Sequence, residues 1–133
     1  MNDYEVYVGL GLAMMLKEAG FDWNIKTFYY NGNLCETGLG EAINHNAADQ
    51  VVSAPTLYVA QKWMRDVMGV NVEVMYLFSP YRHYYARACH LEDSSVLRID
   101  SCSSEAYEVT LEVGLMRALK EEMRLRKQKQ EEK

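Results

Sequence analysis

The sequence predicts an α+β protein whose core is a two-layer sandwich, with an antiparallel sheet of about three strands flanked by helices in the order α-β-β-β-α. Three observations predict this class. Apolar side chains recur at helical spacing after Pro55 and again after Ser104, and between these stripes apolar and polar side chains alternate as they do in strands. Helices and strands that each have one apolar face bury those faces by packing as two layers.

A helix is expected near the start of the chain, before this core. An apolar stripe at helical spacing covers residues 8–19, and Gly20 then ends the helix because glycine readily adopts the left-handed conformation of a helix stop. Gly9 and Gly11 each weaken the first turn by roughly 1 kcal/mol relative to alanine. The start of this helix is therefore less sharply defined by the sequence than its end.

A β-hairpin is expected to follow this helix. Asn31-Gly32 is a dipeptide that readily supplies the two positive φ angles of a tight hairpin turn, and β-forming residues flank it on both sides. Residues 23–30 and 33–37 are therefore expected to pair, as a hairpin or as one bent strand.

The next segment, residues 38–53, lacks a sustained hydrophobic period and predicts a loop with at most one short helical turn. This loop divides the chain into three expected parts. Residues 1–53 form an arm of helix, hairpin and joint loop, residues 54–119 form the α-β-β-β-α core, and residues 120–133 form a charged tail that is helical or disordered.

The first helix of the core is predicted over residues 55–68. Pro55 suits its first turn, where the missing N–H has no helical partner, and Gly69 suits its end. Its expected buried stripe consists of Ala60, Trp63, Met64 and Val67.

Three strands are predicted after this helix. Residues 70–78 alternate between two faces, with Val72, Val74, Tyr76 and Phe78 on the face expected to be buried. Ser79-Pro80-Tyr81 predicts a turn. Residues 84–91 and 95–99 predict the next two strands, separated by a polar segment.

The last helix is expected to be capped by Ser103 or Ser104 and to carry the clearest apolar stripe of the chain. Its members are Tyr107, Leu111, Gly114, Leu115 and Ala118. The resulting order of elements is shared with the double-stranded-RNA-binding domain. However, such domains bind phosphates through basic residues at the start of the last helix, and residues 103–108 contain two glutamates and no basic residue.

The charge distribution argues against nucleic-acid binding by the body of the protein. The net charge of the chain is −5, but residues 1–116 contain seven basic and fifteen acidic side chains, a net charge of −8. Such a body repels a phosphate backbone. The tail is mildly basic, and contact with phosphate or an acidic partner is expected, if anywhere, at Arg124, Arg126, Lys127 and Lys129. Glutamates interrupt this run, so a solvated helix end is the competing interpretation.

The sequence contains no recognisable catalytic, metal or cofactor motif. Cys35, Cys89 and Cys102 are too widely spaced for a zinc knuckle or a disulfide framework, so they are expected to be buried or half-buried thiols. On a strand, His83 and Cys89 point to one face and His90 to the other, so these three neighbours do not form a metal site. For the same reason Cys89 and His90 do not form a pair of nucleophile and base. His45 is expected to be a solvated loop residue. We therefore expect no catalytic residues, no cofactor and no enzymatic activity.

The location expected from the sequence is the cytoplasm. No apolar run approaches the roughly 20 residues needed to cross a bilayer, and the first residues lack the basic flank of a signal peptide.

One cluster indicates a function. Aromatic side chains gather at the predicted turn, and rings with a polar end are favoured at protein interfaces because they bury a large area and still bond. The expected interaction surface consists of Tyr76, Phe78, Tyr81, Tyr84 and Tyr85. An alternative explanation is that these rings pair across strands and stabilise the sheet.

Four motifs occur in order along nearly the whole chain except its tail. They are Leu16-Lys17-Glu18-Ala19-Gly20-Phe21-Asp22, Tyr29-Tyr30-Asn31-Gly32-Asn33-Leu34, Ala54-Pro55-Thr56 with Ala60-Gln61-Lys62-Trp63 and Arg65, and Tyr107-Glu108 with Leu111-Glu112 and Gly114-Leu115. In this set the chain resembles small uncharacterised proteins of phages and mobile elements of Bacteroides and its relatives. The resemblance implies a bacterial cytoplasm and no catalytic residues.

Taken with the aromatic cluster, this leads us to expect a non-enzymatic protein-interaction module that docks on a protein or on a second copy of itself. The alternative is a nucleic-acid accessory factor that uses the basic tail.

Overall fold

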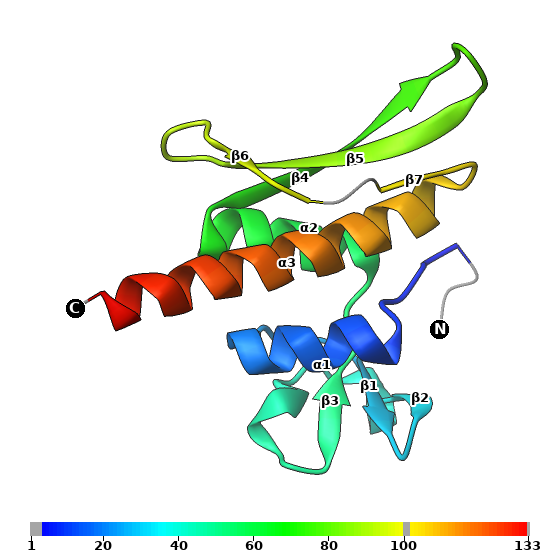
Figure 1. The fold of residues 1–133 in the computed structure, drawn as a ribbon. Helices are drawn as coiled ribbons and strands as arrows, with labels where there is room; N and C mark the ends of the chain where they lie inside the picture. The colour runs from blue at the N-terminus through cyan, green and yellow to red at the C-terminus, as the bar shows by residue number, and fades with distance from the viewer. Residues whose placement is uncertain (1–3, 100–101, 133) are drawn as a thin grey trace. The chain divides into compact units, whose positions relative to one another are not determined.

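The structure, a computed structural model, describes residues 4–99 and 102–132 (Figure 1). The described residues form an α+β fold with three α-helices and two antiparallel sheets. The chain divides into two compact units, Met1–Ala60 (unit 1) and Gln61–Lys133 (unit 2). The division falls inside the second helix, a few residues after the joint expected from the sequence.

Unit 1 begins with helix α1, Leu10–Ala19, which starts two residues later than predicted because Gly9 takes the N-cap position. Gly20 ends the helix as predicted, with φ of +101°, and its N–H and that of Phe21 donate to carbonyls of the last turn. Phe21 is buried just beyond this stop.

The predicted hairpin is confirmed. Strands β1 (Thr27–Tyr30) and β2 (Asn33–Glu36) pair in antiparallel register around Asn31-Gly32, whose φ angles are both positive. Part of the following segment is not a loop, however. Strand β3, Val51–Ser53, pairs with the other edge of β1 and completes a three-stranded sheet in the order β2-β1-β3.

The side chain of Lys17 connects α1 with the segment that leads into β3. Its ammonium donates to the carbonyls of Ala48 and Val51, both at 2.8 Å. Between β2 and β3 lie two short 3₁₀ turns, η1 (Gly38–Gly40) and η2 (His45–Ala47). The structure of residues 45–53 thus depends on contacts with residues far away in the sequence, so the local hydrophobic pattern does not predict it.

Helix α2, Leu57–Trp63, continues as a π-helical segment, η3, over Met64–Met68 and ends at Gly69 as predicted. The expected buried stripe is right for Ala60, Trp63 and Met64 and wrong for Val67, which is 55% exposed. Met68 is buried instead. The wider turn of a π-helix moves the buried face by one position, so the regular 3.6-residue period fails there.

In unit 2, strands β4 (Val70–Leu77) and β5 (His83–His90) form a continuous antiparallel ladder in which Val70 pairs with His90 and Leu77 with His83. The sequence predicted about three strands here, and the described residues form four. Strands β6 (Val96–Leu97) and β7 (Ser103–Ser104) both pair with β5. Strand β6 lies within the strand predicted over residues 95–99, and β7 is the additional strand, too short to produce an alternating pattern.

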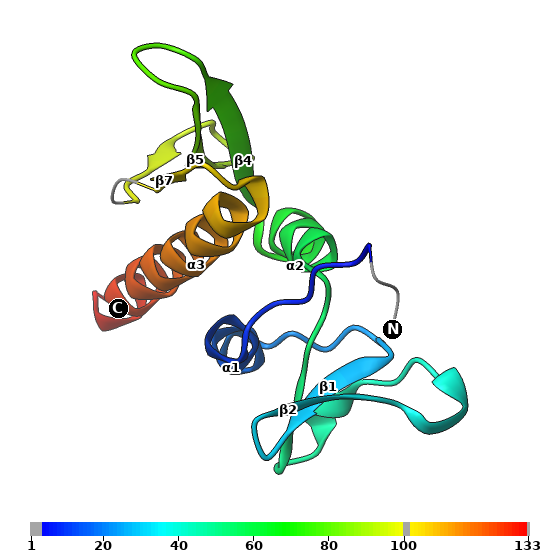
Figure 2. The same ribbon diagram turned by 90° about the vertical axis from the view of Figure 1, so that its right-hand side faces the viewer.

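Helix α3, Tyr107–Glu131, lies along one face of this sheet in both views (Figures 1 and 2). Its predicted stripe is confirmed at the buried residues Leu111, Gly114, Leu115 and Ala118. The helix passes closest to the sheet at Gly114, where an added Cβ would lie 2.7 Å from the Cβ of Ala86. The predicted serine cap is wrong: Ala106 takes the N-cap position without a side-chain bond, and Ser104 belongs to β7.

The charged tail is helical in the described residues, because α3 continues through it to Glu131. No helix in the described part of the chain combines the length and apolar character needed to cross a membrane. The three cysteines are not joined in disulfides, and they are buried at Cys102 and half-buried at Cys35 and Cys89, as expected.

Candidate interaction surface

The five aromatic residues predicted to form an interaction surface lie at one end of the β4–β5 hairpin, which we call the aromatic end. Tyr76 lies on β4 and the half-buried Tyr84 and Tyr85 lie on β5. Phe78 and Tyr81 lie in the connecting turn, which contains the cis Ser79–Pro80 bond. Tyr76, Phe78 and Tyr81 are 50%, 76% and 61% exposed. Large rings with this exposure are available for contact with another molecule.

Alternation along the strands divides these rings between two faces of the sheet. Tyr76 and Tyr84 are directly paired across the ladder, with ring centroids 5.2 Å apart, on the face that α3 covers. Tyr84 also packs edge-to-face on Tyr107 of α3, at 5.5 Å. This aromatic row supports the first turn of α3 and the outer part of β4. The half-buried ring of Tyr84 therefore has a structural role.

The opposite face of the sheet carries Tyr85. Its hydroxyl donates to the sulfur of Met75 at 3.2 Å, across the same strand pair. Further along this face, the guanidinium of Arg87 donates to the carboxylate of Glu73 at 3.0 Å. The five predicted residues therefore contribute to both faces around one hairpin end and do not form a single flat patch.

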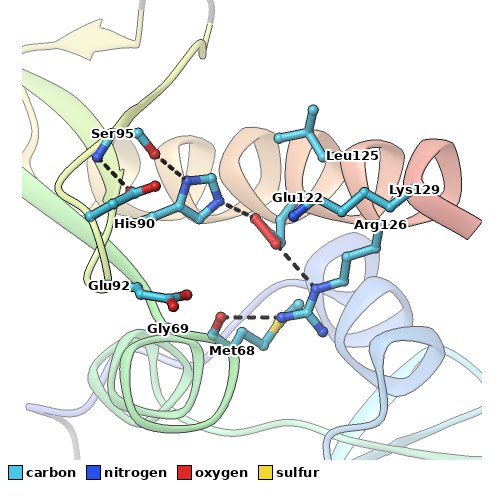
Figure 3. A pocket seen from close by; sticks show the side chains of 10 residues that line it. Met68, Gly69, His90, Glu92, Ser95, Glu122, Leu125, Arg126 and Lys129 are labelled. Atoms are coloured by element: carbon cyan, nitrogen blue, oxygen red, sulfur yellow. Dashed lines mark hydrogen bonds and ion pairs between the residues drawn. The ribbon is translucent and has the colours of Figure 1, made fainter.

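A polar cluster occupies the other end of the hairpin, which we call the polar end: His90, Ser95, Glu122 and Arg126 (Figure 3). The His90 ring bonds Ser95 Oγ through Nδ1 at 2.9 Å and Glu122 Oε2 through Nε2 at 2.6 Å. Arg126 donates to the other oxygen of Glu122 at 3.1 Å and to the carbonyl of Met68 at 3.1 Å. The cluster joins β5, α3 and the end of η3 around a cavity of about 440 Å³.

Sequence reasoning missed this cluster because His90 and Glu122 are 32 residues apart. One signal was available. Glu122 falls four residues after Ala118, so it continues the apolar stripe of α3 as a charged residue at a buried position. It is only 7% exposed. A charge at such a position requires partners, and they are found in His90 and Arg126.

The order Ser95, His90, Glu122 has the connectivity of a hydrolase relay, but its groups are engaged in structural bonds. Arg126 holds the second oxygen of the Glu122 carboxylate. The backbone N–H of Ser95 donates to Asp93 at 2.9 Å, and hydrogen bonds from the Ser95 side chain and backbone hold the pKa of Asp93 below its usual value. This arrangement fits a network that fixes α3 to the sheet.

The four basic residues predicted for phosphate contact lie on the last turns of α3. Arg124 forms a two-pronged ion pair with Glu121, at 2.6 and 3.0 Å, and Arg126 belongs to the polar end. Lys127 and Lys129 are exposed, and Lys129 also lines the cavity. Half of the predicted set is therefore engaged in bonds within the chain.

The interpretation of His45 as a solvated loop residue is wrong. Its side chain is buried in unit 1, where Nε2 lies 2.9 Å from Thr37 Oγ1 and 3.1 Å from the carbonyl of Ile25. The ring stacks on Phe28 at 4.5 Å. Burial lowers the pKa of His45 below its usual value, although the bond to Ile25 opposes this shift. The partners come from β1, from the segment before it and from the residue after β2, which the loop sequence does not indicate.

Other predicted positions agree with the register. His83 and Cys89 lie on one face of β5 and His90 on the other. Within residues 4–99 and 102–132, no three His, Cys, Asp or Glu side chains are grouped so as to hold a metal ion. Comparison with protein families, curated proteins and solved structures found no match to this chain.

Proposed function

We propose that this protein is a non-enzymatic protein-interaction module that binds a protein partner through the aromatic end of the β4–β5 hairpin. The observation that carries this proposal is the exposure of Tyr76, Phe78 and Tyr81 at one place in the fold. Aromatic side chains dominate the energetics of protein interfaces because they bury large areas at a small entropic cost. The rings of Phe78 and Tyr81 lie outside the aromatic row that supports α3, so their presence at the hairpin end favours a role in binding.

The alternative, a nucleic-acid accessory factor that uses the tail, has less support. It relied on four basic side chains, and Arg124 and Arg126 instead bond acidic residues of α3. Ion pairs with neighbouring carboxylates reduce the net positive charge that a phosphate backbone requires. The dsRBD-like order expected from the sequence does not favour RNA binding either, because the start of α3 carries Glu105 and Glu108.

The origin and location of the protein are proposed from its sequence. The resemblance of its four motifs to small proteins of Bacteroides phages and mobile elements leads us to propose a bacterial cytoplasmic protein of such an element. This proposal selects the cell lysate in which a partner should be sought.

The test is affinity purification of the tagged full-length protein from a Bacteroides host lysate, with and without nuclease. The test variant is Phe78→Ser with Tyr81→Ser. The matched control is Tyr58→Ser, which removes a ring that is 51% exposed on α2. We expect a stoichiometric protein that resists nuclease, is lost with the double variant and is retained with the control.

Two outcomes would contradict the proposal. If all three proteins retain the same partner, the aromatic end does not bind it. If the partner disappears on nuclease treatment, and also when Lys127 and Lys129 are both replaced by alanine, the accessory-factor alternative is favoured.

A further inference from the structure

Strand β4 is an edge strand. It pairs with β5 along its whole length, and in the described residues no strand pairs with its other edge (Figure 2). An edge strand presents unpaired backbone N–H and C=O groups, which another chain can complete as an added strand.

The hydrogen bonds around β5 identify which backbone groups face this open edge. Ala86 and His90 direct their N–H groups away from β4, to the carbonyls of Cys102 and Ser95. In an antiparallel ladder, the residues opposite such positions also direct their backbone groups away from the shared side. Their partners on β4 are Val74 and Val70, so every second residue of β4 faces the open edge.

One end of this edge is already occupied within unit 2. The Gln61 side chain donates to the carbonyl of Val72 at 2.7 Å, which confirms that this carbonyl faces outward. Val74 and Tyr76 are the next positions along β4 with outward backbone groups. These two residues therefore form the available segment of the edge.

The edge lacks the features that usually prevent strand addition. Natural edge strands are protected by lysine, proline, bulges or short length. Strand β4 is eight residues long, contains neither lysine nor proline, and keeps an unbroken register with β5. Its one charged side chain, Glu73, is paired with Arg87 of the same sheet.

We propose that the open edge of β4 pairs with β4 of a second copy of this chain, in antiparallel register, with Met75 opposite Met75 of the second copy. This inference goes beyond the proposed function, because it adds a second copy of the chain to the partner sought at the aromatic end. In this register Val74 and Tyr76 of each copy form hydrogen-bonded pairs with Tyr76 and Val74 of the other, which gives four backbone bonds. A register that also paired the backbone of Val72 with the second copy would have to displace the Gln61 side chain from the Val72 carbonyl.

The side chains also fit this register. Tyr76 lies opposite Val74 of the second copy on the helix-covered face, and aromatic and β-branched side chains pair favourably across strands. On the other face, Met75 meets Met75. Glu73 lies opposite Leu77, so no charge meets a like charge, and two copies can join without burying an unpaired ion. A two-fold axis at Met75 relates the copies, the commonest symmetry of protein dimers.

The decisive experiment is a charge exchange at the two-fold axis, measured as mass in solution by analytical ultracentrifugation of the full chain. Met75→Lys places two lysines opposite each other, and Met75→Glu two glutamates. Each variant alone should dimerise roughly 100-fold more weakly than the wild type. An equimolar mixture of the two variants should form the dimer again, because opposite charges then face each other.

Leu77→Lys is the matched control, on the same strand and face. In the proposed register position 77 lies opposite Glu73 of the second copy, so this variant should dimerise at least as well as the wild type. A wild type that stays monomeric, a dimer that Met75→Lys leaves intact, or a mixture that fails to recover the dimer would each overturn the proposal.

Disulfide trapping tests the register in case the charged variants fail to fold. Met75→Cys is made in a chain with Cys35→Ala and Cys89→Ala, which leaves the buried Cys102. Directly opposed residues in a non-hydrogen-bonded pair lie close enough for a disulfide. Mild oxidation should yield a cross-linked dimer with Met75→Cys and none with Leu77→Cys, whose copies lie roughly 13 Å apart along the strands. Equal cross-linking of both variants would overturn the register.

The two proposals fail in different ways. If the chain is monomeric but the Phe78→Ser, Tyr81→Ser variant loses a partner from the lysate, the inference about a second copy is wrong and the interaction module stands. If the chain dimerises through Met75 but no variant of the aromatic rings affects binding of another protein, the dimer stands and the aromatic end has no separate partner.

Discussion

The two ends of the β4–β5 hairpin carry different chemistry on the same strand pair. At the polar end, the buried carboxylate of Glu122 bonds both His90 and Arg126, and Arg126 also donates to the carbonyl of Met68. At the aromatic end, Tyr76, Phe78 and Tyr81 are half-exposed or more. Within unit 2, groups that bond inside the chain hold the fold together at one end, while the groups that remain available for another molecule are concentrated at the other.

The difference follows from the position of α3. The helix begins beside the aromatic end, at Tyr107, and passes over the middle of the sheet at Gly114. Its later turns bring Glu122 to His90. The helix thus covers the sheet from Tyr84 to the polar end, where a buried charge must find partners, and leaves the hairpin turn beyond its start.

The largest effect on stability is expected from the loss of Glu122. Glu122→Ala leaves the ring of His90 and the guanidinium of Arg126 without their shared carboxylate. Breaking a buried pair typically costs 3–5 kcal/mol, but both partners are partly exposed, so we expect a loss of about 2 kcal/mol in the free energy of unfolding. Urea unfolding monitored by circular dichroism measures it.

Glu121→Ala is the matched control for this prediction. It removes the neighbouring carboxylate and its ion pair with Arg124. Because both variants replace glutamate with alanine in the same helix, the change in helix propensity is the same for the two. Because this pair is exposed, the expected loss is under about 0.5 kcal/mol. Equal losses for the two variants would show that the polar end does not stabilise the fold.

A smaller effect is expected midway between the two ends. Gly114→Ala adds a methyl group that would lie 2.7 Å from the Cβ of Ala86 and 3.4 Å from Val72. Overpacking of this kind costs roughly 1–3 kcal/mol, and the better helix propensity of alanine returns about 1 kcal/mol. We therefore expect a net destabilisation of about 1 kcal/mol in thermal unfolding. A more stable variant would mean that α3 does not approach the sheet closely there.

The buried His45 of unit 1 lies in a different environment from His90 at the polar end. Its ring bonds neutral oxygens, and burial is the main cause of its lowered pKa. The unfolded chain binds a proton at this site more readily than the folded chain. Stability is therefore fully present above the unfolded pKa of about 6.5 and falls as the pH decreases below it.

This pH dependence is measurable as the urea midpoint at pH 7.5 and at pH 5.5. We expect His45→Gln, which removes the titrating ring, to reduce the difference between the two midpoints. An unchanged difference would assign the pH dependence to other groups.

The smallest effect on stability is expected at the aromatic end. Phe78→Ser and Tyr81→Ser remove rings that lie mostly in solvent, so each should change the free energy of unfolding by less than about 0.5 kcal/mol. The same variants should affect partner binding. A loss of stability above about 1 kcal/mol, measured by thermal unfolding, would indicate that the rings are structural and would weaken the distinction between the two ends.

The parts of the fold that the sequence predicted are those with local causes. Asn31-Gly32 defines a hairpin through two φ angles, Gly20 and Gly69 end their helices, and the stripe around Leu115 keeps one period. The aromatic end was predicted for the same reason, because its residues are close together in the chain.

The parts that it did not predict depend on residues far apart. Strand β3 is specified by its pairing with β1, more than 20 residues earlier, and Glu122 meets His90 only when α3 lies on the sheet. The buried side of η3 changed because a π-helical segment has a different period, which placed Met68 inside and Val67 outside. Patterns along a chain describe single elements, and these features arise between elements.

The proposed association of this chain at the edge of β4 beside the aromatic end should be visible directly in the mass of the full chain in solution. Sedimentation equilibrium should give a mass twice 15.4 kDa for the wild type, a return to 15.4 kDa for Met75→Lys, and the doubled mass for Leu77→Lys. A wild-type mass of 15.4 kDa at every concentration, or a doubled mass for Met75→Lys, would show that the chain does not associate through this edge.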